Sequence, residues 1–495
     1  MKNEGKIPMQ NIITAAVMCL LLAIAAYFIV PDNKYKRLYI LLAVISVILR
    51  LVTVAYLYSD GVDTFGTDGL LYHRIGKWVS RQLGEGTPVY AVKYVYTWYT
   101  VLVGVVYHIF GINRFLVSYI NIALAFLSAL LLLKIALGLK YRFSNAAFIS
   151  LSFLFFPNLI LWTSDSRKEA LTIFICVLCF YCLQRFLAGT YHVGMRSAGV
   201  YHEGTCSAAM CPAGIQPAGN VPSKPAADST ASEHSVHDNA DFTANTDPDT
   251  SADTYKHASA SIFRNIRTVC IIVLSCLLIW LGTLVRIYMV IPMAAGILLS
   301  LLLSYIKNRE KLYLLFGLAI IISSLIILIF TVCPLLEDYH AVTFPEEIGD
   351  FSTDMANKVE TIKLIASNRD ILLTALNYFL LPYPGNTGIA EIRGSVALNV
   401  IVSIDMIFWY LCLLLMVPGI IAAVKNKESF LLGLLAFLTL YSVINIIAVE
   451  NVPDTIYRYR SLTAGLSLLF IDWKIISQTR SRIFGLHQRA ESLNR

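Results

Sequence analysis

The chain has 495 residues, of which 57% are hydrophobic and 14% are charged, and its formal net charge is +7. This composition excludes a soluble globular enzyme, and the lack of ten-residue alternating segments excludes a membrane barrel. The positive charge lies in short loops and in the C-terminal tail, as in many membrane proteins, and does not indicate nucleic acid binding.

Apolar runs fill most of the chain, and a run of about 20 residues is long enough to cross a bilayer as a helix. The first run is followed by PDNKYKR rather than a cleavage site, so we interpret it as an uncleaved span. The runs are 12–30, 38–58, 94–110, 116–137, 146–163, 170–188, 268–285, 287–306, 312–334, 398–423, 429–449 and 460–476. We therefore expect an all-α polytopic transmembrane helical bundle of about 11 to 12 membrane segments.

Simple alternation of these segments contradicts the positive-inside rule. The loops agree with the rule if one segment does not cross the membrane. The best candidate is 146–163, which Pro157 and Asn158 interrupt at mid-depth. With 146–163 re-entrant, Arg114 and the basic loops are expected in the cytoplasm, and the turn at 164–169 and the long loops 59–93 and 335–397 on the outer face. Both outer loops are expected to carry amphipathic interfacial helices, the second over 376–386.

The chain divides by composition into six regions. Residues 190–262 are rich in Ala, Ser, Thr, Asp and Pro and lack aliphatic periodicity, so we expect a disordered cytoplasmic insertion. The regions are 1–189 (N-terminal transmembrane module), 190–262 (insertion), 263–334 (central transmembrane helices), 335–397 (second outer loop), 398–476 (C-terminal transmembrane helices) and 477–495 (basic cytoplasmic tail).

The first outer loop carries the leading catalytic candidates. Asp60, Asp63 and Asp68 follow one apolar segment, and Asp68 and Tyr72 share a face of a short helix that lies flat on the membrane. Crowded carboxylates at a membrane surface suit proton transfer on a polar substrate. The alternative is a solvated loop whose carboxylates pair with nearby basic side chains.

The sequence SDSRKEA at 164–170 places charged residues between two apolar segments. Ser166 and Glu169 have the spacing of a helix capping box, which can coexist with a functional role. Arg167 and Lys168 in this turn are candidates for binding substrate.

Arginines in or near the later spans are further candidates. Arg286 interrupts a long apolar run as either a snorkelling hinge residue or a phosphate ligand. Tyr457, Arg458 and Arg460 stand where a lipid phosphate headgroup would lie. A guanidinium group can bind two phosphate oxygens at once, so these arginines are candidates for binding the phosphate; anchoring at the membrane interface is the alternative. Arg50 lies within its apolar segment and requires a partner or a wet cavity.

Together these residues resemble the GT-C class of membrane glycosyltransferases, such as protein O-mannosyltransferases and aminoarabinose transferases. The resemblance rests on Asp68 and Tyr72, Pro157 and Trp162 with the SRKEA turn, Arg286, Glu450 and Asn451, and the Tyr-Arg-Tyr-Arg run at 457–460. Many relatives carry an Asp-Glu pair in the first loop, whereas Gly69 follows Asp68 here.

The resemblance implies a sugar donor carried on polyprenyl phosphate and a lipid, glycan or protein acceptor. By this resemblance the general base is Asp68, with Asp63 as the second choice. The arginines would stabilise the negative charge of the departing lipid phosphate. It implies a bacterial plasma membrane and cell envelope polysaccharide biosynthesis, with the site facing outside. No cofactor is expected, although a divalent metal stays open. An envelope polysaccharide polymerase or ligase and a lipid or polysaccharide flippase are the alternatives.

Overall fold

The computed structural model describes residues 9–59, 67–89, 98–197, 249–332, 377–384, 396–448 and 453–472. In these ranges the chain forms helices, and nine of the helices are long and apolar enough to cross a membrane. The protein is therefore an all-helical integral membrane protein. The chain forms two units, residues 193–268 and the remainder, and the remainder contains the transmembrane bundle.

The nine candidate spans confirm most of the apolar runs in the sequence. They belong to α1 (Met9–Ile29), α2 (Lys36–Ser59), α5 (Arg114–Gly138), α8 (Glu169–Ser197), α9 (Asp249–Val285), α10 (Val290–Asn308), α11 (Lys311–Ile327, continued by Leu328–Val332), α15 (Val396–Lys425) and α16 (Ser429–Ala448). Helices α10 and α16 pack closely because Gly296 faces the carbonyl of Gly433, and a Cβ on Gly296 would lie 2.8 Å from that oxygen. Small residues at such crossings bring backbones together where the hydrophobic effect cannot drive association.

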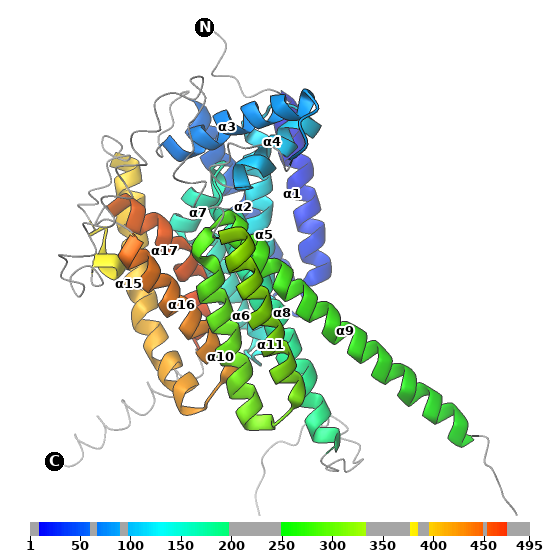
Figure 1. The fold of residues 1–495 in the computed structure, drawn as a ribbon. Coiled ribbons are helices and arrows are strands. Elements are labelled where there is room, and N and C mark those ends of the chain that lie inside the picture. Colours follow the sequence, from blue (N-terminus) through cyan, green and yellow to red (C-terminus); the bar gives the residue numbers. More distant parts are fainter. Residues whose placement is uncertain are drawn as a thin grey trace, which may run out of the picture. The chain divides into compact units, whose positions relative to one another are not determined.

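Helices α3 (Thr67–Gly84) and α4 (Trp98–Phe110) form a pair at one end of the bundle, where α3 lies across the ends of the long helices (Figure 1). The predicted helix in the first loop is thus confirmed. Its apolar stripe of Leu71, Ile75 and Val79 is buried, and α3 packs mainly on α4. Helix α4 has 13 residues and a length of about 20 Å, which is too short to cross the hydrocarbon core.

The predicted interruption at Pro157 is confirmed. Helix α6 (Phe143–Phe155) ends there, and α7 (Pro157–Ser164) continues at an angle of 54°. The predicted return to the same face is not confirmed, because the pair runs antiparallel to α5 along its length. Ser150 donates a hydrogen bond to the carbonyl of Ala129 near the middle of α5, whereas Asn121, near its beginning, donates to the carbonyl of Asp165.

Two buried charged residues meet the helix ends at this break. The guanidinium of Arg50, from α2, donates to the carbonyl of Leu154 at 2.6 Å, in the last turn of α6. A carboxyl oxygen of Asp405, from α15, accepts from the backbone N–H of Asn158 at 3.0 Å, in the first turn of α7. The free carbonyls and N–H groups at helix ends attract charges of these signs.

One topological prediction is wrong. Arg114 was expected on the opposite side of the membrane from the turn at 164–169, yet its guanidinium lies 3.2 Å from the carboxylate of Asp165. The short helix α4 precedes Arg114, and its failure to cross brings the start of α5 to the end of the bundle where α3 lies. The contact therefore places the start of α5 and the turn at 164–169 at the same end of the bundle.

The last helical segment also traverses the bundle. Helix α17 (Pro453–Ser467) is followed by a short 3-10 helix, Leu468–Phe470. Arg458 contacts Glu169 near its start, and the carbonyl of Leu469 accepts from Tyr141 in the loop after α5. Both ends of the predicted insertion are helical, since α8 continues to Ser197 and α9 begins at Asp249; residues 198–248 lie outside the described part.

Candidate functional site

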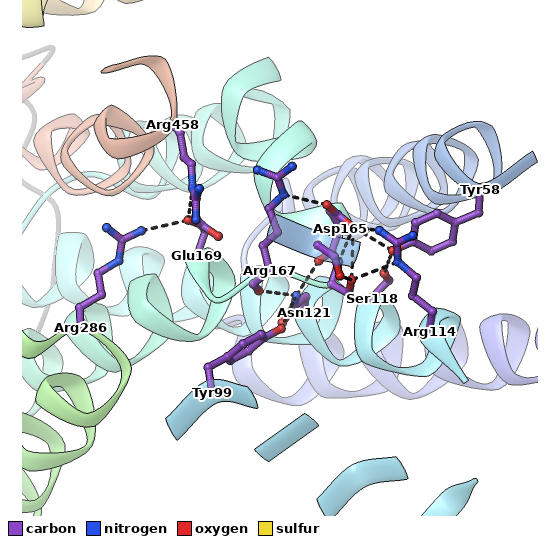
Figure 2. Close-up of polar contacts among 12 residues, drawn as sticks. Tyr58, Tyr99, Arg114, Ser118, Asn121, Asp165, Arg167, Glu169, Arg286 and Arg458 are labelled. Carbon is purple, nitrogen blue, oxygen red and sulfur yellow. Dashed lines mark hydrogen bonds and ion pairs between the residues drawn. The ribbon is translucent and has the colours of Figure 1, made fainter. Parts of the chain in front are cut away.

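The turn between α7 and α8 is built around the buried carboxylate of Asp165 (Figure 2). Arg167 Nε lies 2.8 Å from one carboxylate oxygen, and Arg114 Nη2 lies 3.2 Å from the other. The hydroxyl of Tyr58 and the N–H of Ser166 also donate to this second oxygen. Burial alone raises the pKa of Asp165, but the two guanidinium groups outweigh this effect, so the pKa lies below its usual value.

Asn121 fixes the backbone of this turn from α5. Its side-chain amide donates to the carbonyls of Asp165 and Arg167, at 2.6 and 2.7 Å, and to the hydroxyl of Tyr99 at 3.3 Å. An amide in an otherwise apolar helix requires such partners, because an unpaired polar group is costly in a membrane. The contacts explain why a turn rich in charge has a defined shape.

The first turn of α3 abuts the same turn of the chain. The hydroxyl of Ser166 lies 3.3 Å from the carbonyl of Gly69 and 3.2 Å from Nε of Arg114. A Cβ on Gly69 would lie 2.5 Å from Oδ2 of Asp165, so only glycine permits this approach. Ser166 therefore contacts α3 instead of completing the predicted capping box. The backbone of Asp68, the residue before Gly69, is thereby placed beside the turn.

A second group of charges lies at the start of α8. Arg286, between α9 and α10, and Arg458, on α17, both approach the same carboxylate oxygen of Glu169, at 3.0 and 2.5 Å (Figure 2). The side chains of Glu169 and Arg286 are 1% and 3% exposed, whereas that of Arg458 is 13% exposed. Among the described residues, the other carboxylate oxygen and Nε of Arg286 have no hydrogen-bond partner.

Aromatic rings connect the two groups. The guanidinium groups of Arg167 and Arg458 lie 4.7 and 6.0 Å from the ring of Trp162. This indole thus contacts both the group around Asp165 and the group around Glu169. Tyr459 lies within 4.7 Å of Arg286, and Lys168 lies 6.0 Å from the ring of Tyr72. Cation–π contacts of this kind orient guanidinium groups and stabilise them where water is scarce.

We name this assembly the charged cluster: Arg114, Asp165, Arg167, Lys168, Glu169, Arg286 and Arg458. Of the described residues in it, five are cations and two are carboxylates. These seven side chains together carry a formal charge of +3. Such a site can bind an anion, and its arginines can do so through paired hydrogen bonds.

The structure brings together five of the residues predicted from the sequence: Tyr72, Arg167, Lys168, Arg286 and Arg458. Arg460 lies apart from them. Its guanidinium donates to the carbonyls of Phe379 and Leu381 and lies 5.2 Å from the ring of Trp409, so it holds residues 377–384 in place.

Tyr457 packs its ring against Trp162, at 6.4 Å, and faces the helix break, where its carbonyl accepts from the side chain of Asn158. Asp63 lies outside the described residues. Asp68 is described as part of α3, but its side chain is not.

The contacts of Arg114 and Asn121 with this turn were not predicted from the sequence. Asn121 is the sole Asn, Asp, Glu or Gln in the run 116–137, and that isolation was the available signal. Among the described residues, no group of three His, Cys, Asp or Glu side chains could hold a metal ion. No family model, curated protein or solved structure matches this chain.

Proposed function

We propose that the charged cluster binds the phosphate of a polyprenyl-phosphate sugar and that the protein transfers this sugar to an acceptor. The observation that carries the proposal is the convergence of Arg286 and Arg458 on one oxygen of Glu169, which leaves a buried N–H of Arg286 without a partner among the described residues. A phosphate oxygen would satisfy that donor.

The chemistry divides between the cluster and the start of α3. Asp68, beside the turn, removes the proton of the acceptor hydroxyl as its oxygen attacks the anomeric carbon. The bond between that carbon and the phosphate oxygen breaks, and the lipid phosphate gains negative charge. Arg286 and Arg458 stabilise this charge, most strongly where water is excluded.

The charged cluster faces the outside of the cell in this proposal. The basic loops lie at the other end of the bundle: Lys140 and Arg142 follow α5, Lys307 ends α10, and Lys425 ends α15. Under the positive-inside rule that end is cytoplasmic. We propose that the membrane is that of a bacterial cell and that the acceptor is an envelope glycan, lipid or protein.

A flippase or transporter is less well supported. The two charged residues deepest in apolar spans, Arg50 and Asp405, bind helix ends at the break. Charges that line a transport pathway would instead face one another or a water-filled cavity. A polymerase or ligase that uses lipid-linked oligosaccharides shares the phosphate chemistry and stays an alternative outcome of the test.

The test is a transfer assay with purified full-length protein. A panel of radiolabelled undecaprenyl-phosphate sugars is offered with envelope lipid extracts to wild type and to Asp68→Asn. We expect transfer by wild type and a loss of about 10²- to 10⁴-fold in the variant. Full transfer by Asp68→Asn removes Asp68 as the base. Chain growth with lipid-linked oligosaccharides alone establishes the polymerase.

A further inference from the structure

The guanidinium of Arg286 is held on two sides. Its Nη2 lies 3.0 Å from Oε1 of Glu169, and its Nη1 donates to the hydroxyl of Tyr288 at 2.8 Å. The ring of Tyr459 covers the guanidinium at 4.7 Å. Two hydrogen bonds in the plane and one ring contact therefore fix how the guanidinium is rotated, and Nε is the nitrogen that no described residue binds.

The hydroxyl of Tyr288 is held in turn by Asn445, in α16. Tyr288 lies in the short 3-10 helix Ile287–Met289, between α9 and α10, and its hydroxyl donates to Oδ1 of Asn445 at 3.2 Å. Nδ2 of Asn445 donates to the carbonyl of Tyr441 at 2.7 Å, one turn earlier in α16. The rings of Tyr288 and Tyr441 also pack, with their centres 6.2 Å apart. We call Tyr288 and Asn445 the α16 relay.

The relay has one direction of donation. The carbonyl of Tyr441 can only accept, so it faces Nδ2 of Asn445 and leaves Oδ1 as an acceptor. The single phenol proton of Tyr288 goes to this Oδ1, and its oxygen therefore accepts from Nη1 of Arg286. The backbone of α16 thus determines where Nη1 of Arg286 is held.

Asn445 stands out in its helix. The other residues of α16, Ser429–Ala448, include no Asn, Asp, Glu, Gln, His, Lys or Arg. Asn445 is 1% exposed, and a buried amide in an apolar span is costly unless both of its polar atoms are hydrogen-bonded. The relay uses both atoms, and it connects them to Arg286.

The ion pair of Arg286 and Glu169 has a second arrangement that the relay opposes. Nε and Nη2 lie on the same edge of a guanidinium, and a carboxylate can bind both at once. Such a bidentate pair would use Nε of Arg286 and Oε2 of Glu169, the two atoms that have no hydrogen-bond partner among the described residues. In the structure, Nη1 is held by Tyr288 instead, and Oε1 is shared with Nε of Arg458 at 2.5 Å.

We infer that the α16 relay holds the pair of Arg286 and Glu169 open, so that Nε of Arg286 can donate to the phosphate of the lipid-linked substrate. Tyr288 and Asn445 are positioning residues, since they act through Arg286. The inference rests on the proposed function, because that function supplies the phosphate. Without the relay, the pair closes and its own carboxylate competes with the phosphate.

The test is equilibrium binding of radiolabelled undecaprenyl phosphate to purified full-length protein, competed by unlabelled undecaprenyl phosphate or by undecaprenol. The relay variant is Tyr288→Phe with Asn445→Leu, because removing both polar partners together can leave stability nearly unchanged. We expect its Kd to rise about tenfold, which is about 1.4 kcal/mol, at an unchanged midpoint of chemical denaturation. Tyr288→Phe alone serves if the double variant does not fold.

Two comparisons separate positioning from a general loss of stability. Asn308→Leu with Tyr313→Phe makes the same substitutions at the other end of the bundle, where Nδ2 of Asn308 donates to the hydroxyl of Tyr313 at 3.1 Å. This control should keep the wild-type Kd. In an Arg286→Lys background, which retains the charge but has no Nε–H beside a second donor, the relay substitutions should raise the Kd less than about twofold further.

The outcomes separate the relay from the function. A wild-type Kd in the relay variant, or an equal rise in the control, refutes the relay and leaves phosphate binding standing. A tenfold rise that persists in the Arg286→Lys background also refutes it. Phosphate binding that depends on the relay, without transfer of any sugar, supports the relay and counts against the function. Equal competition by undecaprenol and undecaprenyl phosphate in wild type contradicts both.

Discussion

The charged cluster and the helix break at Pro157 both bury charges in a membrane protein, but they use them differently. At the break, Arg50 and Asp405 each contact a helix end, and each has the sign that the helix end attracts. In the charged cluster, two arginines approach one oxygen of Glu169, and the described side chains include more cations than carboxylates. The two regions thus differ in what their buried charges contact, which is a helix end at the break and side chains of opposite charge in the cluster.

The largest expected effect concerns this surplus of charge. Replacing Arg458 by Gln removes a phosphate donor, and we expect the rate of sugar transfer to fall about 10²- to 10³-fold, as when one donor is removed from an electrostatic site. Arg460→Gln, two residues along α17, is the matched control. It loosens residues 377–384, so it should lower thermal stability, with a smaller loss of transfer. Equal losses of transfer would contradict the distinction between the two arginines.

Stability should respond strongly when the shared carboxylate is removed. Glu169→Ala leaves two guanidinium groups buried without their partner, and we expect a loss of about 3–5 kcal/mol in the free energy of unfolding. Chemical denaturation in detergent measures it. The double variant Glu169→Ala with Arg286→Met removes charge of both signs and should recover part of the loss. Absence of any recovery would show that packing, rather than unpaired charge, causes the effect.

At the helix break the expected effects are smaller and confined to stability. Asp405→Leu removes the acceptor at the first turn of α7, and we expect a loss of about 1–2 kcal/mol, the cost of losing a helix cap. Asp405→Asn retains an acceptor oxygen and should cost less. Sugar transfer per folded molecule should stay near that of wild type in both. A selective loss of transfer in Asp405→Asn would give the break a catalytic or transport role.

Gly69 tests whether contact between α3 and the turn matters to function. A methyl group there would lie 2.5 Å from Oδ2 of Asp165, so Gly69→Ala must shift the first turn of α3, at a cost of about 1–3 kcal/mol. Gly76→Ala is the control, because its methyl group would meet Val103 at 2.5 Å, away from the charges. Both variants should melt earlier, but Gly69→Ala should also reduce transfer.

The smallest expected effect is a dependence of stability on pH through His73, which shares a 2.7 Å hydrogen bond with Tyr107. Burial, with Arg114, Lys77 and Arg74 nearby, lowers the pKa of His73 to about 4. In the unfolded chain the imidazole of His73 becomes protonated below about pH 6.5, whereas in the folded protein it stays neutral down to about pH 4. The free energy of unfolding should therefore fall as the pH drops from about 6.5 to 4. His73→Gln should flatten the decline in melting temperature over that window. An unchanged slope in the variant would assign the decline to other groups.

The sequence predicted the helical class, most spans and the break at Pro157, because long apolar runs and a proline report directly on local structure. It did not predict that Arg114 and the turn at 164–169 lie at the same end of the bundle, so the side of the membrane assigned to Arg114 was wrong. The length of an apolar run is a weak guide to whether the segment crosses the membrane when the segment packs on a neighbouring helix, as α4 packs on α3.

The candidate site was predicted in part. Arg286, Arg458 and the SRKEA turn stood out because charges interrupt apolar sequence, but their meeting at Glu169 joins residues 117 and 289 positions apart. Local patterns contain no information on such pairing. Arg460 shows the converse: the Tyr-Arg-Tyr-Arg run made two arginines look equivalent, and the helix turns them toward different partners.

The most direct test of the central claim is binding of a lipid phosphate to purified full-length protein. The shift in melting temperature caused by undecaprenyl phosphate, against undecaprenol, is measured for wild type, Arg286→Gln and Arg50→Gln. A ligand at a hundredfold its dissociation constant stabilises the folded state by about 2.7 kcal/mol. We predict a shift specific to the phosphate in wild type and Arg50→Gln and none in Arg286→Gln. A shift retained in Arg286→Gln, or lost in Arg50→Gln alone, would contradict the assignment of phosphate binding to the charged cluster.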